Sequence, residues 1–179
     1  MTTIINMLTF LRIFLALIIF LLLMKPDGYL LALILFIIAS VTDYFDGYLA
    51  RKYNATSQIG EILDPIADKV LLVFALIGLS INLSSYLVGF ISSLIITREI
   101  WVGALRDMNS RYGNTMATKV TFLAKIKTST QLFTISIYLL GLSLNNMLMI
   151  VLGDIFLFLS FFITMYTGLI YTRNSFKNL

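Results

Sequence analysis

The stretch DYFDGYLARKYNATSQIGEILDPIAD, residues 43–68, decides the fold of this chain, because it places four aspartates between two strongly apolar segments. Asp43 and Asp46 are three residues apart, and Asp64 and Asp68 are four apart. In helices, either spacing puts both members of a pair on one face. The polar loop between the pairs, residues 53–58, is short, so the sequence predicts two antiparallel neighbouring helices that both carry acids.

The rest of the chain has the composition of a membrane protein. Of its 179 residues 59% are apolar and only 12% are charged, and the mean hydropathy is +0.95. The apolar N-terminal run has no small-residue cleavage site and precedes further apolar runs, so we expect a membrane span there rather than a signal peptide. Cysteine and histidine are both missing from the sequence. Any metal must therefore be held by oxygen atoms, which favours Mg²⁺ or Mn²⁺.

Six apolar runs predict an all-α integral membrane protein with six transmembrane helices. Runs of about 20 residues suit a hydrocarbon core of about 30 Å, and none shows the period-two alternation of strands. We expect residues 1–179 to form a single membrane domain. The runs cover about residues 7–24, 29–52, 60–79, 86–106, 120–142 and 147–171, with a long polar segment at 107–119.

The basic residues predict the orientation. The loops at 82–85 and 145–146 carry no charge, whereas Arg51, Lys52, the cluster from Arg98 to Lys127, and the basic residues near the C-terminus all fall at the opposite helix ends. By the positive-inside rule, both termini and the acid-bearing loop face the cytoplasm. Lys25, on the expected outer side, is a single exception.

The four acids are predicted to lie at one depth. At 1.5 Å per residue, Asp43 lies about 9 Å short of the inner boundary, and Asp64 and Asp68 lie about 6 and 12 Å deep. Ionisable residues at such depths usually mark function. Protonation, snorkelling to the interface, or pairing with Arg51 and Lys69 are alternatives, but two basic residues cannot balance four acids. Two divalent cations about 4 Å apart could, and they could also clamp a pyrophosphate.

Small residues and a proline complete this stretch. Gly47 and Ala50 would clear space beside the acids, although close helix packing is an alternative role for them. Gly60 is expected to open the third helix. Pro65 suits the first position of a helix, which would make Asp64 the N-cap.

The pattern Asp43-x2-Asp46-Gly47-x2-Ala50-Arg51-x8-Gly60-x3-Asp64-x3-Asp68 resembles the signature of the CDP-alcohol phosphatidyltransferase family at every fixed position. The resemblance implies a six-helix membrane enzyme, typically a homodimer, that transfers a phosphatidyl group from CDP-diacylglycerol to an alcohol and releases CMP. It implies that two divalent cations, Mg²⁺ or Mn²⁺, are held by the four aspartates, and that Asp68 is also the catalytic base. The residues implied to bind CDP-diacylglycerol are Asn6, Thr9, Gly47, Ala50, Arg51 and Gly60.

The acceptor must be chosen by residues outside this signature. Arg98 is predicted about 12 Å below the inner boundary, level with the acids. Several cations near the acids favour a phosphorylated acceptor, and those that gather on the same side as Arg98 are Arg106, Arg111, Lys119, Lys125 and Lys127. Glu99 could instead be a simple partner of Arg98, and the other cations could reflect the positive-inside bias or attraction to anionic lipid.

Further segments resemble the branch of the family that makes phosphatidylglycerophosphate from glycerol 3-phosphate. These are Asn6-x-Leu8-Thr9-x2-Arg12, Arg98-Glu99-Ile100, Ala104-Leu105-Arg106 and Lys125-Ile126-Lys127-Thr128. Glu61 departs from the branch, which often has lysine there. The resemblance implies a phosphate site made of Arg98, Arg106, Lys125 and Lys127, in an enzyme of the bacterial cytoplasmic membrane whose active site faces the cytoplasm, with membrane lipid around it and no nucleic acid partner.

Other acceptors and one other class of protein remain open. The acceptor could be inositol phosphate, serine or phosphatidylglycerol, although a neutral acceptor would leave Arg98 without a function. Four intramembrane acids could also belong to a divalent-cation or proton transporter. Such a protein should show broken helices or an inverted repeat, and neither is visible in the sequence. Asp154, in the last apolar run, has no role in any of these schemes.

Overall fold

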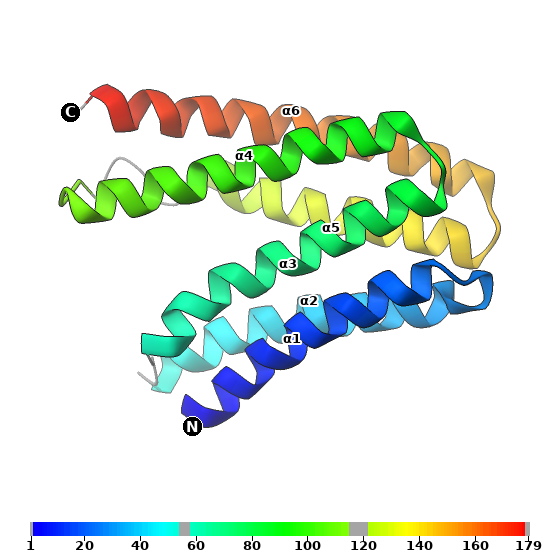
Figure 1. The fold of residues 1–179 in the computed structure, drawn as a ribbon, viewed down its shortest axis with the longest axis horizontal. Coiled ribbons are helices and arrows are strands. Elements are labelled where there is room, and N and C mark those ends of the chain that lie inside the picture. The colour runs from blue at the N-terminus through cyan, green and yellow to red at the C-terminus, as the bar shows by residue number, and fades with distance from the viewer. Residues whose placement is uncertain (1, 54–57, 115–121, 178–179) are drawn as a thin grey trace.

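The computed structural model describes residues 2–53, 58–114 and 122–177, of which the side chains of residues 2–5, 43–53, 58–59 and 61–62 lie outside the description. Within these ranges the chain is helical, with short turns between helices (Figure 1). This confirms the all-α prediction. The elements are α1 (Thr2–Leu23), the 3₁₀ helix η1 (Pro26–Gly28), α2 (Tyr29–Tyr53), α3 (Gln58–Asn82), α4 (Tyr86–Arg111), α5 (Phe122–Ser143) and α6 (Met147–Lys177).

The helices present an apolar exterior. Large apolar side chains such as Phe10, Phe90, Leu148 and Phe162 are more than half exposed, as expected for groups that face lipid rather than water. Among the described residues, three helical segments are long and apolar enough to cross a membrane: Asn6–Leu23, Tyr86–Arg111 and Met147–Lys177. The protein is therefore embedded in a membrane. Six spans were predicted, and the described residues support three of them.

The helices form two groups that diverge towards one end of the molecule (Figure 1). In the first group α1 packs against α2 and α3, and in the second α6 packs against α4 and α5. Contacts of α2 with α5 and of α3 with α4 join the groups. Figure 1 shows the turns before α2, α4 and α6 at the closed end, and both ends of the chain at the open end.

Polar side chains fix the turns at the closed end. The Asn82 side chain donates to the carbonyl of Leu23 at 2.7 Å and to the Tyr29 hydroxyl at 2.8 Å, which ties the end of α3 to the turn between α1 and α2. Ser85 caps α4 by accepting a hydrogen bond from the Val88 amide. Gly28 is required because a Cβ there would overlap the Leu22 carbonyl.

Two expected helix boundaries are wrong. Helix α3 begins at Gln58, so Pro65 lies inside the helix and Asp64 is not an N-cap. An interior proline removes one backbone hydrogen bond, which membrane helices tolerate when neighbouring groups satisfy the freed carbonyl. Helix α4 continues past residue 106 to Arg111, because its last turns have partners: Asn109 donates to Ser175 of α6 at 2.8 Å, and Arg111 pairs with Asp107 one turn earlier.

Asp154, which had no predicted role, has a structural partner. The hydroxyl of Tyr138 on α5 donates to Asp154 Oδ1 on α6 at 2.6 Å. The ring of Tyr138 is completely buried and packs against Gly153, where a Cβ would come within 2.6 Å of the ring. These contacts join α5 to α6 within the core.

Candidate active site

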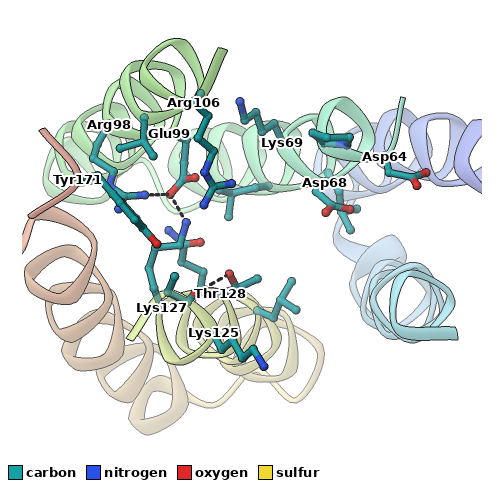
Figure 2. A pocket seen from close by; sticks show the side chains of 18 of the residues that line it. Asp64, Asp68, Lys69, Arg98, Glu99, Arg106, Lys125, Lys127, Thr128 and Tyr171 are labelled. Carbon is teal, nitrogen blue, oxygen red and sulfur yellow. Dashed lines mark hydrogen bonds and ion pairs between the residues drawn. The ribbon is translucent and has the colours of Figure 1, made fainter. Parts of the chain in front are cut away.

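A cavity of about 880 Å³ lies between the two groups of helices (Figure 2). Each of the six α-helices contributes at least one described residue to its lining. Two sets of charged side chains face it. We call Asp64 and Asp68 of α3 the acidic side. We call the four predicted phosphate contacts, which also line this cavity, the basic side: Arg98, Arg106, Lys125 and Lys127.

Helix α1 holds both carboxylates of the acidic side. Thr9 donates from Oγ1 to Asp64 Oδ1 at 2.7 Å, and Arg12 Nη1 pairs with Asp68 Oδ1 at 2.6 Å. Arg12 is only 1% exposed, whereas the Asp68 side chain is 51% exposed and open to the cavity. A charge-assisted bond from a buried guanidinium fixes the direction of the carboxylate. Helix α1 therefore orients the acids that α3 supplies.

The acidic side has the chemistry of a site for hard cations, since Asp64 and Asp68 are one turn apart and offer only oxygen ligands. Asp43 and Asp46 lie on α2, but their side chains, like those of Gly47, Ala50 and Arg51, are outside the described residues. Where side chains are described, no group of three or more His, Cys, Asp or Glu could hold a metal ion. The set of four ligands stays a prediction.

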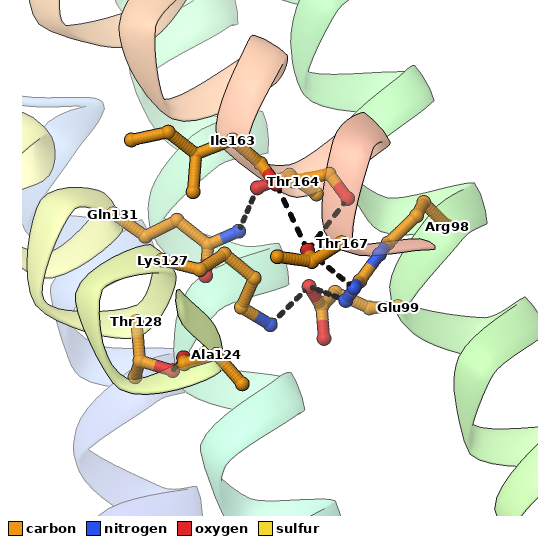
Figure 3. Close-up of polar contacts among 9 residues, drawn as sticks. All are labelled: Arg98, Glu99, Ala124, Lys127, Thr128, Gln131, Ile163, Thr164 and Thr167. Atoms are coloured by element: carbon orange, nitrogen blue, oxygen red, sulfur yellow. Dashed lines mark hydrogen bonds and ion pairs between the residues drawn. The ribbon is translucent and has the colours of Figure 1, made fainter. Parts of the chain in front are cut away.

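Glu99 organises the floor of the basic side (Figure 3). Its Oε1 accepts from Lys127 Nζ at 2.5 Å and pairs with Arg98 Nη1 at 3.1 Å. The other terminal nitrogen of the Arg98 guanidinium, Nη2, donates to the Thr167 hydroxyl of α6 at 2.7 Å. Glu99 is thus a partner of Arg98, as one interpretation of the sequence allowed. It also serves Lys127, so one carboxylate faces two cations.

The remaining cations extend the basic side towards the open end. Arg106 and Lys125 are exposed, and the guanidinium of Arg106 lies 5.7 Å from the centre of the Tyr171 ring. Lys69, considered above as a partner of the acids, reaches towards Gly103 of α4, so its ammonium lies near the backbone of that helix. Figure 2 shows Lys69 between Asp68 and the arginines. The cavity therefore passes from carboxylates on α3 to a majority of cations on α4 and α5.

The other predicted site residues are on the first group of helices. Asn6 lies on α1, one turn before Thr9, and Gly60 is buried in the first turn of α3. No described contact tests whether they bind CDP-diacylglycerol.

Sequence reasoning missed several residues that shape the cavity. Arg12 had a signal, because it is the single charge in the first apolar run, and a charge at that depth normally has a partner. No such signal existed in the sequence for Thr167 and Tyr171. Hydroxyl-bearing side chains are common in membrane helices, and no motif or charge in the last apolar run pointed to these two positions. Their proximity to Arg98 depends on how α6 packs against α4.

Comparison with known proteins gives consistent matches. The sequence model of the CDP-alcohol phosphatidyltransferase family matches residues 2–169. The chain is 39% identical over 151 residues to a Rickettsia bellii protein named CDP-diacylglycerol–glycerol-3-phosphate 3-phosphatidyltransferase, a match that covers 83% of this chain and 81% of that one. A Blochmanniella floridana protein of the same name is 37% identical over 138 residues, or 77% and 71% of the two chains. One from Escherichia coli K12 is 38% identical over 101 residues, 56% of each.

Proposed function

Because this chain belongs to the CDP-alcohol phosphatidyltransferase family, we propose that it transfers the phosphatidyl group of CDP-diacylglycerol to glycerol 3-phosphate, releasing CMP and forming phosphatidylglycerophosphate. The signature at residues 43–68 predicted the family correctly. The relatives named above carry the name of this reaction, which supports both the donor and the acceptor.

One observation supports the proposal most: a single cavity contains Asp64 and Asp68 together with four cations from α4 and α5. The reaction needs carboxylates near the pyrophosphate of the donor and positive charge near the phosphate of the acceptor. A cavity of about 880 Å³ has room for a nucleotide headgroup and a small acceptor. The acyl chains of the donor would stay in the surrounding lipid.

We assign Asp43, Asp46, Asp64 and Asp68 to two divalent cations, Mg²⁺ or Mn²⁺. The oxygen-only ligands of the acidic side fit such ions. When bound, the ions would draw charge from the pyrophosphate and make CMP a better leaving group. Thr9 and Arg12 would keep Asp64 and Asp68 pointed at the cavity before the ions and the donor arrive.

The proposed chemical step is an in-line displacement at the β-phosphorus of CDP-diacylglycerol. A glycerol oxygen forms the new bond to phosphorus, and the bond from phosphorus to the bridging oxygen breaks, so that CMP leaves with that oxygen. Asp68 accepts the proton of the attacking hydroxyl. Its Oδ1 is held by Arg12 and its side chain is half open to the cavity, which suits a proton acceptor that must reach a substrate.

The basic side would bind the phosphate of glycerol 3-phosphate. Arg98 and Lys127 form the floor, and the exposed Arg106 and Lys125 can close on the anion from the open end. Guanidinium groups suit phosphate because they donate two parallel hydrogen bonds. Serine, which has no phosphate and no net charge, would leave these four cations with only the carboxylates of Glu99 and Asp107 among the described lining residues of α4 and α5.

We place the enzyme in the bacterial cytoplasmic membrane as a homodimer, with six spans and the open end towards the cytoplasm. Helices of 22 to 31 residues are long enough to cross a hydrocarbon core of about 30 Å. The basic residues at the open end support that orientation.

CMP release by the purified protein tests the proposal. The protein, supplied with CDP-diacylglycerol and Mg²⁺ or Mn²⁺, is given glycerol 3-phosphate, serine, inositol phosphate or phosphatidylglycerol in parallel. We expect release with glycerol 3-phosphate to exceed release with serine by at least about 100-fold, since a site built for a phosphate rejects an acceptor that leaves its cations unpaired. Release with glycerol 3-phosphate should also exceed release with inositol phosphate and with phosphatidylglycerol. Faster release with any other acceptor would reassign the acceptor, and no release with any would refute the transferase.

A further inference from the structure

Three residues of α6 lie next to the guanidinium of Arg98: Thr167, which Figure 3 shows, Gly168 and Tyr171. Thr167 accepts from Nη2 at 2.7 Å. At Gly168 a Cβ would come within 2.8 Å of Nε, so the backbone of α6 can approach the arginine only because that residue has no side chain. The ring of Tyr171, one turn later, has its centre 5.9 Å from Cζ of Arg98. The Arg98 guanidinium therefore lies next to the hydroxyl of Thr167, the backbone at Gly168 and the aromatic ring of Tyr171.

These contacts fix the plane of the guanidinium. Nη1 pairs with Glu99 at 3.1 Å and Nη2 with Thr167 at 2.7 Å, so two donors of a rigid planar group have fixed partners. The Thr167 hydroxyl donates its proton within α6, where the Ile163 carbonyl lies 2.9 Å away and the Thr164 carbonyl 3.0 Å away. Its lone pairs therefore remain for Arg98. Since Arg98 is only 7% exposed, a small tilt would change which of its atoms reach the cavity.

Tyr171 also lies close to two arginines of the basic side. The Cζ atoms of Arg98 and Arg106 lie 5.9 and 5.7 Å from the same ring centre. Two guanidinium groups repel each other, and an aromatic ring attracts both. The ring is 2% exposed and lines the cavity, so it holds both cations at the wall to which a phosphate would bind (Figure 2).

We propose that Thr167, Gly168 and Tyr171 of α6 are positioning residues that set the guanidinium groups of Arg98 and Arg106 for the phosphate of the acceptor. Helix α6 thereby contributes to acceptor choice, although the family signature lies on α2 and α3. The inference rests on the proposed function, because it takes a phosphorylated alcohol as the acceptor.

The test separates the Michaelis constants of the two substrates. Gly168→Ala pushes Arg98 away from α6, and Tyr171→Leu removes the aromatic face while keeping an apolar side chain. We expect each to raise KM for glycerol 3-phosphate by about tenfold or more and to change KM for CDP-diacylglycerol by less than about twofold. Tyr171→Phe keeps the ring and should restore most of the acceptor affinity.

Gly153→Ala is a matched control, because its Cβ would also press on a neighbour, the Tyr138 ring at 2.6 Å, at a place that does not line the cavity. It should lower the melting temperature without a selective rise in KM for the acceptor. If α6 had a purely structural role, Gly168→Ala would behave like Gly153→Ala and would lower the melting temperature without a selective rise in KM for the acceptor. That result would overturn the inference. Equal changes in the KM values of both substrates would also overturn it. Should Tyr171→Leu fail to fold, Thr167→Val supplies the second measurement.

Failure of the proposed function would look different. In that case the unmodified protein would release no CMP with glycerol 3-phosphate. A fully active unmodified protein whose α6 variants show no acceptor-selective change would refute only the role of α6.

Discussion

Arg12 is the residue whose contact most changes the interpretation of the acidic side. It pairs with Asp68 at 2.6 Å from a fully buried position on α1, so it determines where one carboxylate oxygen points. The sequence argument weighed Arg51 and Lys69 as possible partners for the acids. The described residues add a third cation, from a helix that carries none of the acids.

Replacing Arg12 should impair the use of the metal. Arg12→Met keeps the volume of the side chain but removes the charge, so Asp68 loses a fixed orientation. We expect activity at saturating substrates to fall by about 10- to 100-fold, and the Mg²⁺ concentration for half-maximal activation to rise, as is usual when a residue behind a metal ligand is removed. Arg12→Lys should recover part of the loss. Activity is measured as CMP release over a Mg²⁺ titration.

Arg111→Met is the matched control. Arg111 also pairs with an aspartate, Asp107, at 2.8 Å, but the side chains of both residues are mostly exposed at the end of α4. Exposed pairs contribute little, so the Mg²⁺ titration should be unchanged. If Arg12→Met and Arg111→Met gave the same Mg²⁺ curve as the unmodified protein, Arg12 would have no part in orienting Asp68.

At the scale of helices, the contact between Tyr138 and Asp154 predicts a stability effect that is separate from activity. Tyr138→Phe removes the hydroxyl that donates to Asp154 at 2.6 Å and leaves a partly buried carboxylate with one bond fewer. Such a loss within membrane helices costs about 1 kcal/mol, which would lower the melting temperature in detergent by about 2–4 °C. CMP release per folded molecule should not change, because neither residue lines the cavity.

Tyr166→Phe on α6 provides the comparison, since Tyr166 is 59% exposed on the outside of the bundle. Its melting temperature should stay within about 1 °C of the unmodified value. An unchanged melting temperature for Tyr138→Phe would remove the structural role assigned to the pair. Loss of activity at a temperature where the variant is folded would give the pair a function.

The helices themselves were largely predictable, whereas their polar ends were not. Apolar runs and uncharged turns located the helices, and the starts of α2, α4 and α6 at Tyr29, Tyr86 and Met147 were predicted correctly. The polar last turns of α4 have partners on α6, such as Ser175, which accepts a hydrogen bond from Asn109. Hydropathy cannot reveal such a contact. Likewise, the preference of proline for a first turn misplaced the start of α3, because tertiary packing tolerates Pro65 within the helix.

At the scale of the whole molecule, the sequence predicted which charged residues share a cavity better than it predicted what holds them. Spacing and depth placed Asp64, Asp68 and Arg98 at a common level and the other three cations of the basic side on the same side of the membrane, and all six line one cavity. Their supporting contacts run between helices distant in the sequence, from Thr9 to Asp64 and from Arg98 to Thr167. Such contacts depend on how α1 and α6 pack, which periodicity within a single helix does not encode.

The two-sided cavity also explains how one small bundle can serve two different substrates. Carboxylates from the first group of helices would face the pyrophosphate of the donor, and cations from the second group would face the phosphate of the acceptor. The groups diverge only at the open end, so both substrates would enter from the side on which the chain termini lie (Figure 1).

Formation of phosphatidylglycerophosphate by Asp68→Asn tests the central claim most directly. The product is measured by mass spectrometry after incubation with CDP-diacylglycerol, glycerol 3-phosphate and Mg²⁺, next to the unmodified protein and Asp27→Asn, a change at an exposed aspartate in η1. We predict that Asp68→Asn lowers the rate by about 10²- to 10⁴-fold while the melting temperature is kept, because the proposed general base and a proposed metal ligand are lost together. Asp27→Asn should match the unmodified protein. A rate for Asp68→Asn above about one tenth of the unmodified rate would contradict the account.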